Sequence, residues 1–463
     1  MNNTFYIETM GCQMNKLDSE LIFGQLVRLG FQNTDIPEKA GIIIFNTCSV
    51  RQHAEDKVIS KIGQLRRRHQ EHPEMILAIV GCMAQRLGQD LLNNHQQVDI
   101  VCGPGQLHQL SSMVREIHNK RTRLIALNDT ATTDEPLEKL DSTRRHLNNA
   151  IPFQAYVRIS RGCNNYCSYC IVPYVRGPER SRPTRNIIDE SRRLVDNGVK
   201  EITLLGQTVN SYQYKENGKV MVLADLLEKL HDIPDLKRLR FVTSYPRHFD
   251  KRLFQAMAAL PKVCPYLHLC AQSGSDRILK AMNRHYSVRQ YLDIIERGRE
   301  MVPQLTVAGD FIVGFPGEQE DDFQMTMDLV RKVRYKNCFI FKYSPRPGTR
   351  AEVRLQNDIP DEVKKRRNTE LLALQNEIAL QDNQQFVGNK VEVMVEGPSK
   401  KPHLDKAETS SANSSGCQLA GRTPGDHIVV FDGSLDLAGE IIPVTVTKAS
   451  ALTLFAKRYT HRV

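Results

Sequence analysis

The 463-residue sequence lacks the features that would place it in a membrane or outside the cell. No apolar run approaches the ~20 residues that a membrane-spanning helix requires. The first residues, Met1 to Phe5, show no basic segment followed by an apolar one, so no signal peptide is evident. The eleven cysteines fall mostly at motif positions and do not form a dense disulfide framework. We therefore expect a cytoplasmic protein with reduced thiols and no membrane contact.

A dinucleotide site is also missing from the first domain, because no Gly-x-Gly-x-x-Gly follows its first predicted strand. The net charge of +10 and the pI near 9.0 favour an anionic partner, of which nucleic acid is the usual one. The length is too great for one ordinary core and predicts several domains.

The predicted fold class is α/β, in three domains joined by one linker. Residues 1–120 alternate strands and helices in the pattern of a parallel sheet, and residues 121–150 have the polar composition of a linker. Residues 151–385 repeat a strand-helix pattern six times, which predicts a partial (β/α)6 barrel followed by a long polar helix. Residues 386–463 show short strands and turns typical of a small β-barrel.

The most specific motif is Cys163-x3-Cys167-x2-Cys170, directly after a predicted strand. Thiolates select soft metals and iron–sulfur clusters, and three cysteines leave one iron of a [4Fe-4S] cluster open to a ligand. Two other interpretations are a zinc site completed by a distant histidine, or buried structural thiols. No second cysteine pair or His-x3-5-His follows, so an open-iron cluster is favoured over zinc.

A second set of cysteines ends the predicted strands of the first domain: Cys12, Cys48 and Cys82, with Cys102 after the fourth strand. Ligands of parallel sheets bind beyond the carboxyl ends of the strands, so these thiols are expected at one sheet edge. A second cluster is therefore predicted there, with buried structural thiols as the alternative. Neighbouring polar residues that could support it are Asn15, Asp18, Asn46 and Arg51.

Polar or glycine-rich segments follow five consecutive strands of the predicted barrel, where barrel active sites lie. They are Gln207 and Asn210, Thr243 and Ser244, Gln272 to Ser275, Asp310 with Gly314 to Glu318, and Ser344 to Thr349.

The run Lys364 to Arg367 on the following helix is interpreted as a solvated face or a nucleic-acid contact. Basic β-barrels often bind RNA, although the last domain is also interpretable as an accessory domain.

These motifs together resemble the radical-SAM methylthiotransferase family, and within it the bacterial tRNA-modifying subgroup. The matching stretches include Gly11 to Asn15, Asn46 to Arg51, Gly81-Cys82, Arg161 to Cys170, Pro173 to Gly177, Gln272 to Arg277, Asp310 to Glu318 and Arg346 to Thr349. The resemblance covers all three domains and implies that the last one is a TRAM domain. One departure is Cys270-Ala271, where many relatives carry Pro-Val; we interpret Cys270 as a small buried hydrophobe.

The resemblance implies two [4Fe-4S] clusters, one on Cys163, Cys167 and Cys170 and one on Cys12, Cys48 and Cys82, and it makes Cys102 a structural thiol. It also implies S-adenosyl-L-methionine as cofactor, bound near Gln207, Ser244, Gln272, Asp310 and Gly314. No catalytic residue beyond the cluster ligands is assigned.

The implied reaction methylthiolates C2 of N6-isopentenyladenosine at position 37 of tRNA. A methyl group is transferred to a cluster-bound sulfur, and radical hydrogen abstraction then precedes C–S bond formation. Expected partners are the tRNA anticodon stem-loop and a low-potential electron donor, with the chain acting as a monomer. The alternatives are methylthiolation of a ribosomal-protein aspartate or of threonylcarbamoyl-adenosine in tRNA, and a non-catalytic iron–sulfur protein that binds RNA.

Overall fold

The computed structural model describes residues 3–49, 52–120, 122–128, 135–141, 144, 153–400 and 417–458. The chain divides into two compact units. Unit 1 comprises residues 1–198, 204–221 and 346–349, and unit 2 comprises residues 199–203, 222–345 and 350–463. Each unit is described by itself.

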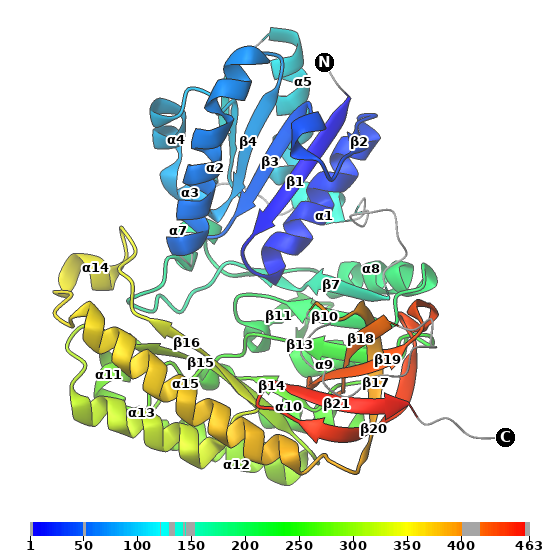
Figure 1. The fold of residues 1–463 in the computed structure, drawn as a ribbon, viewed down its shortest axis with the longest axis vertical. Coiled ribbons are helices and arrows are strands. Elements are labelled where there is room, and N and C mark those ends of the chain that lie inside the picture. The colour runs from blue at the N-terminus through cyan, green and yellow to red at the C-terminus, as the bar shows by residue number, and fades with distance from the viewer. Residues whose placement is uncertain are drawn as a thin grey trace. The chain divides into compact units, whose positions relative to one another are not determined.

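The amino-terminal part of unit 1 is a parallel sheet of six strands in the order β2-β1-β3-β4-β5-β6 (Figure 1). Their bounds are β1 Thr4–Met10, β2 Gln32–Asn33, β3 Ile42–Thr47, β4 Ile76–Gly81, β5 Ile100–Cys102 and β6 Leu124–Ala126. Every residue of β3 and β4 is buried. Continuous burial is expected of central parallel strands, since helices cover both of their faces.

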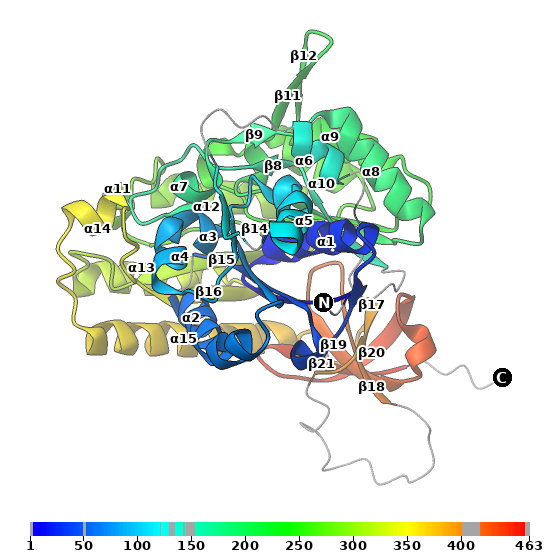
Figure 2. The same ribbon diagram turned by 90° about the horizontal axis from the view of Figure 1, so that it is seen from above.

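Helices α1 and α2 pack on opposite faces of this sheet (Figure 2). One core contains Leu21, Ile22 and Leu26 of α1, and the other contains Val58 and Ile62 of α2. The helices of this part are α1 Gln13–Arg28, α2 Gln52–Glu71, α3 Cys82–Leu87, α4 Gln89–Asn94, α5 Leu110–Lys120 and α6 Glu135–Asp141. Because helices cover both faces, a site in this sheet is expected at the ends of its strands.

The segment predicted to be a linker contains two regular elements. Strand β6 extends the sheet beyond β5, and α6 places Leu137 and Leu140 in the α1-side core. A three-residue strand is too short to show hydrophobic alternation, so β6 was not predicted. Of residues 121–150, the structure describes 122–128, 135–141 and Arg144.

The later part of unit 1 carries short elements around the central cysteine motif. They are β7 Gln154–Arg158, β8 Ser160–Arg161, α7 Val172–Arg176, β9 Arg180–Ser181, α8 Thr184–Asp196 and β11 Gln213–Glu216. The Ile159 N–H donates to the Leu205 carbonyl at 2.9 Å, so the chain leaving β7 lies beside the end of β10, Glu201–Leu205. Strand β12, Lys219–Val222, completes a hairpin with β11.

Unit 2 contains the remaining strands of the predicted barrel, in sequence order. The Arg238 N–H bonds to the Lys200 carbonyl, a parallel bridge joins Ser244 to Leu269, and β14, β15 and β16 form one parallel sheet. The strands are β13 Arg238–Phe241, β14 Tyr266–His268, β15 Thr306–Val313 and β16 Asn337–Lys342. The helices are α9 Leu223–His231, α10 Lys251–Ala259, α11 Asp276–Ala281, α12 Val288–Met301, α13 Glu320–Val333, α14 Arg350–Arg354 and α15 Asp361–Gln384. All six predicted strands are present, as the partial barrel requires.

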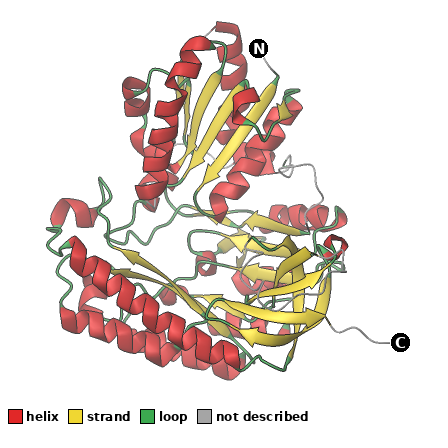
Figure 3. Cartoon of the chain, viewed as in Figure 1, coloured by secondary structure: helices red, strands yellow, loops and turns green. Residues whose placement is uncertain are grey.

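The carboxyl-terminal residues form a closed barrel in the order β17-β18-β19-β21-β20 (Figure 3). The strands are β17 Lys390–Pro398, β18 Cys417–Arg422, β19 Ile428–Gly433, β20 Ile441–Ala449 and β21 Thr453–Arg458. Within unit 2 the Arg240 guanidinium of β13 donates to the carbonyls of Thr423 and Pro424, which holds this barrel against β13. The small barrel is as predicted, whereas β18 was not predicted.

Most side chains of the basic run Lys364 to Arg367 on α15 contact other residues of unit 2. Lys364 and Arg367 are buried, and Arg367 pairs with the buried Glu318 at 2.8 Å. Arg366 pairs with Glu320 at 2.7 Å. Three of the four cations therefore have structural roles, which weakens the interpretation as a nucleic-acid contact. None of the helices in the described part of the chain is long and apolar enough to cross a membrane.

Candidate active site

The first group of site residues is the amino-terminal cysteine set, Cys12, Cys48 and Cys82. Cys12 follows the end of β1, and Cys48 and Cys82 directly follow β3 and β4. The parallel register pairs Met10 with Thr47 and Thr47 with Gly81, so the three strands end level with one another. The three thiols therefore meet at one edge of the sheet, as their positions in the sequence predicted.

The three thiols influence one another's protonation. A hydrogen bond with the Cys48 thiol lowers the pKa of Cys12 to about 6, and the nearby Arg176 acts in the same direction. Burial raises the pKa of Cys82, against the effect of the same arginine. A set of three converging thiols, one of them already acidic, is the donor chemistry that an iron–sulfur cluster requires.

Two glycines allow the chain to close around these thiols. Gly81 has φ of +93°, and a Cβ there would lie 2.6 Å from Asn46 Oδ1. A Cβ at Gly11 would lie 2.7 Å from Cys48 Cβ. Both contacts are closer than real Cβ atoms tolerate, so only glycine fits at either position.

An amide network supports the same edge of the sheet. Asn15 accepts a hydrogen bond from the Cys12 thiol at 3.2 Å and donates to Asn46 Oδ1 at 2.8 Å. Asn46 in turn donates to Ser19 Oγ at 2.9 Å. Asn15 and Asn46 thus have the supporting position expected from the sequence, whereas Arg51 lies outside the described residues.

Arg176 is a buried cation beside this cysteine set. Its Nε donates to Cys82 Sγ at 3.3 Å, and its Nη2 donates to Asp18 Oδ2 at 2.9 Å. Burial alone would lower the pKa of Arg176, but Cys82 and Asp18 raise it well above its usual value, so the guanidinium stays charged. A fixed positive charge beside a cysteine sulfur favours the thiolate, which is the form that can bind a metal.

The second group is the Cys163, Cys167 and Cys170 set, on the loop between β8 and α7. The Cys170 N–H donates to the Cys167 carbonyl at 3.0 Å, and the Cys163 and Cys167 thiols lie near enough to interact electrostatically. Asn165 Nδ2 donates to Cys163 Sγ at 3.3 Å. Burial raises the pKa of Cys163, against the effect of the hydrogen bonds from Asn165 and Thr208.

The two cysteine sets are joined by α7, within unit 1. Ile171, which follows Cys170, and Val175 of α7 pack against Cys82. Arg176, the last residue of α7, reaches the same thiol. A single five-residue helix therefore connects the loop of one set to Cys82 of the other.

The residues expected near S-adenosylmethionine lie in both units. In unit 1, Gln207 follows β10, and its Oε1 is buried without a hydrogen-bond partner among the described residues. In unit 2, Ser244 Oγ is likewise buried and has no hydrogen-bond partner within the described ranges. Buried polar atoms of this kind are normally satisfied by a ligand or water. Both atoms therefore suit a polar cofactor.

The other three expected residues lie on or just beyond the neighbouring strands β14 and β15 of unit 2. Gln272 has φ of +69°, and its N–H donates to the Asp310 carbonyl at 2.7 Å. The Gly314 N–H donates to Glu318 Oε1 at 2.9 Å. Burial alone would raise the pKa of Asp310, but the neighbouring His268 ring and the Cys270 thiol lower it, so the carboxylate is ionised. Cys270 is thus buried but hydrogen-bonded, so its interpretation as only a small hydrophobe was incomplete.

Cys102 is separate from both cysteine sets. It lies in the α1-side core, and burial raises its pKa to about 12. Its side chain thus behaves as a structural thiol, as the resemblance implied.

Two residues near the amino-terminal cysteine set, Arg176 and Glu55, were not given a role from the sequence. Glu55 accepts hydrogen bonds from Ser49 at 2.7 Å and from Arg86 at 2.7 Å, beside Cys48. The Pro173 to Gly177 motif was the signal that could have identified Arg176.

Two sequence families match the chain. Residues 4–103 match the uncharacterized protein family UPF0004, and residues 157–330 match the radical SAM superfamily. The tRNA-2-methylthio-N(6)-dimethylallyladenosine synthase of Rhodopirellula baltica is 44% identical over 100% of this chain and 97% of its own length. The protein of the same name from Syntrophotalea carbinolica is 43% identical over 96% of this chain and 97% of its own.

The fold also resembles a solved structure. The radical S-adenosylmethionine methyltransferase TsrM from Kitasatospora setae aligns with a TM-score of 0.54 and 14% identity, over 76% of this chain and 75% of that one. At that identity the likeness concerns the fold alone. Full-length identity above 40% carries the stronger conclusion: this chain belongs to the tRNA-2-methylthio-N(6)-dimethylallyladenosine synthase family of the radical SAM superfamily.

Proposed function

We propose that this chain is a transferase that methylthiolates C2 of N6-isopentenyladenosine at position 37 of tRNA, using S-adenosyl-L-methionine and two [4Fe-4S] clusters. The observation that carries the proposal is the pair of three-cysteine sets joined through α7 in unit 1. One set would supply the radical chemistry and the other the sulfur chemistry. Relatives that carry the name of this activity match along the whole chain.

In this proposal Cys163, Cys167 and Cys170 hold the cluster whose open iron binds S-adenosylmethionine. Asn165 and Thr208 stabilise the Cys163 thiolate, since Asn165 donates to Sγ at 3.3 Å and Thr208 Oγ1 lies 3.7 Å from it. Gln207, Ser244, Gln272, Asp310 and Gly314 bind or position the cofactor. The orphaned atoms of Gln207 and Ser244 support this assignment.

Cys12, Cys48 and Cys82 hold the second cluster, which carries the sulfur to be methylated. Arg176 donates to Cys82 Sγ and favours its thiolate against the effect of burial, and Asn15 orients Cys12 through its 3.2 Å hydrogen bond. Gly11 and Gly81 leave room for the backbone to approach the site. These residues prepare the ligands, and the cluster supplies the sulfur chemistry when it is bound.

The anionic partner is the anticodon stem-loop of tRNA, which the net charge of +10 favours. The closed barrel of residues 386–463 is the proposed TRAM domain. The proposed setting is the cytoplasm, where thiols stay reduced and a low-potential electron donor is at hand, with the chain acting as a monomer. The proposed domains are residues 1–120, a linker of residues 121–150 and residues 151–385; within the linker, β6 pairs with β5 of the first domain.

The test is incubation of cluster-loaded enzyme with S-adenosylmethionine, reductant and tRNA that carries isopentenyladenosine, followed by mass spectrometry of nucleosides and 5′-deoxyadenosine. Cys163→Ala should abolish 5′-deoxyadenosine. Cys48→Ala should retain it but give no methylthiolated nucleoside, because radical formation does not need the second cluster. Cys102→Ala, a buried thiol outside both sets, is the matched control and should keep both products. Methylthiolated product from Cys48→Ala would contradict the proposal.

The alternative activities are tested in the same reaction. A ribosomal protein, or tRNA carrying threonylcarbamoyl-adenosine, replaces the proposed substrate. Product on either one, with none on isopentenyladenosine, would replace the proposal. An absence of 5′-deoxyadenosine under all conditions would favour a non-catalytic RNA-binding protein.

A further inference from the structure

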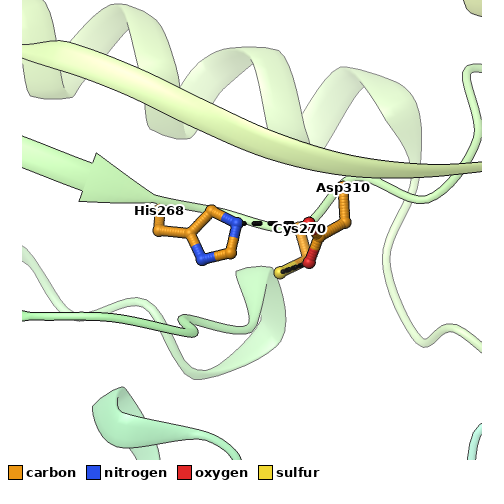
Figure 4. Close-up of side chains that lie close together, drawn as sticks. All are labelled: His268, Cys270 and Asp310. Atoms are coloured by element: carbon orange, nitrogen blue, oxygen red, sulfur yellow. Dashed lines mark hydrogen bonds and ion pairs between the residues drawn. The ribbon is translucent and has the colours of Figure 1, made fainter. Parts of the chain in front are cut away.

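A histidine, a cysteine and an aspartate converge on one face of the unit 2 sheet (Figure 4). His268 ends β14, and Cys270 lies two residues later, so both side chains project from the same face. The register pairs His268 with Ala308 of β15, and Asp310 lies two residues beyond Ala308. The neighbouring strands therefore bring three potential metal ligands to one point.

The distances between the ligand atoms are short. Cys270 Sγ lies 3.0 Å from Asp310 Oδ2, and His268 Nε2 lies 3.4 Å from Asp310 Oδ1. All three ligand atoms lie within 4.8 Å of one another. Ligands of a tetrahedral zinc ion sit ~2.0–2.3 Å from the metal, which separates them from each other by roughly 3.3–3.8 Å. Small side-chain rotations would thus complete the geometry.

The surroundings also favour a bound cation. His268 Nε2 is buried and lies 3.4 Å from Asp310 Oδ1. The other oxygen of the same carboxylate accepts a hydrogen bond from the Cys270 thiol. An imidazole and a thiol that face one carboxylate form a donor set that Zn²⁺ accepts.

We propose that His268, Cys270 and Asp310 form a binding site for Zn²⁺ with one coordination position open to an external ligand. Thiolate and imidazole ligands select zinc over Mg²⁺ and Ca²⁺, which prefer oxygen. Three protein ligands are the arrangement of zinc sites that keep an exchangeable fourth position. The cysteine proton leaves when the metal binds, so the Cys270-to-Asp310 hydrogen bond belongs to the metal-free state.

The site is independent of the two cluster sets, because it uses none of their cysteines. It depends on Cys270, the position at which this sequence departs from the Pro-Val of many relatives. Asp310 also belongs to the proposed S-adenosylmethionine contacts. The test therefore changes Cys270 and His268, which lie outside that set.

The experiment adds one equivalent of ZnCl2 to the full-length, cluster-loaded enzyme under anaerobic conditions. Zinc retained after desalting is measured by mass spectrometry, and its ligands are identified by X-ray absorption at the zinc edge, which iron does not obscure. The wild type should retain one zinc with one sulfur and otherwise nitrogen or oxygen ligands. Cys270→Ala and His268→Gln should each weaken binding by at least about 100-fold, since loss of a direct ligand exceeds the 10–100-fold effect of an outer-shell partner.

The matched control is Cys264→Ala, which removes a buried thiol just before the same strand and should bind zinc as the wild type does. Iron content and anaerobic denaturant unfolding confirm that each variant is folded and loaded. The proposal is overturned if the wild type retains no zinc, if Cys270→Ala retains it with unchanged affinity, or if zinc is bound by three sulfurs, which would place it on cluster cysteines. Failure of the proposed tRNA reaction would leave all of these readouts intact.

Discussion

Replacing Arg176 tests whether the amino-terminal cysteine set depends on a buried cation. The guanidinium lies 2.9 Å from Asp18 Oδ2, and the exposed fractions of the two side chains are 7% and 1%. At an effective dielectric constant of about 20, unit charges at that distance attract by about 6 kcal/mol. Removing one member of a buried pair typically costs about 3–5 kcal/mol, because the other charge is left unpaired. Arg176→Leu should therefore destabilise the protein by about 3–5 kcal/mol.

The assay is anaerobic denaturant unfolding of the cluster-loaded protein, with iron content measured beside it. In the double variant Arg176→Leu with Asp18→Asn, the carboxylate is removed as well, so the loss should be smaller than the sum of the two single losses. The stability of Arg176→Lys should lie between those of wild type and Arg176→Leu. Lysine keeps the positive charge, but its ammonium group cannot donate to Asp18 and Cys82 with the planar geometry of a guanidinium.

The matched control is Arg67→Leu, which breaks the exposed 2.8 Å pair with Glu71 on α2 and should change stability by less than about 1 kcal/mol. The Leu variant should also lose iron from the second cluster, since Cys82 loses its cationic partner. Stability within about 1 kcal/mol of wild type, with additive losses in the double variant, would refute the reasoning.

Two further predictions concern Gly81 and His427. Gly81→Ala should remove about four of about eight irons, because its Cβ would lie 2.6 Å from Asn46 Oδ1; Gly218→Ala, also at positive φ but with open space around it, should keep them all. Equal iron content in the two variants would contradict this, because it would show that Asn46 can move away from the added Cβ without loss of the cluster. Burial lowers the pKa of His427 from 6.5 to about 4, so the unfolded chain binds the proton first and stability is lost as pH falls from about 6.5 through 4. About 2 kcal/mol of this contribution should be gone by pH 5, and His427→Gln should lose that part of the pH dependence in unfolding experiments. An unchanged pH dependence in the variant would contradict the assignment.

The sequence predicted the architecture and the positions of the cysteines because both follow from short-range patterns. Strands β3 and β4 each begin with at least four consecutive apolar residues, and the cysteine that follows each strand is visible in the sequence. The parallel order of those strands then forces the thiols together. Strand β18 was missed because it lies next to a polar segment and carries little apolar alternation.

Long-range pairings were not predictable, because nothing local marks them. Arg176 is 158 positions from Asp18 and 94 from Cys82, yet it contacts both. Arg367 belongs to what reads as a solvated basic run, but Glu318 pairs with it in the interior. Cys270 looked like a packing substitution until the neighbouring strand placed Asp310 beside it. In each case the deciding partner comes from another element of the fold.

The most direct test of the proposed function is to digest tRNA after reaction with the wild-type enzyme and to measure the mass of its isopentenyladenosine nucleoside. We expect the nucleoside to gain one methylthio group in place of one hydrogen, and 5′-deoxyadenosine to form in the same reaction. If 5′-deoxyadenosine forms while the nucleoside keeps its original mass, the chain is a radical enzyme that acts on another substrate, and the proposed function is wrong.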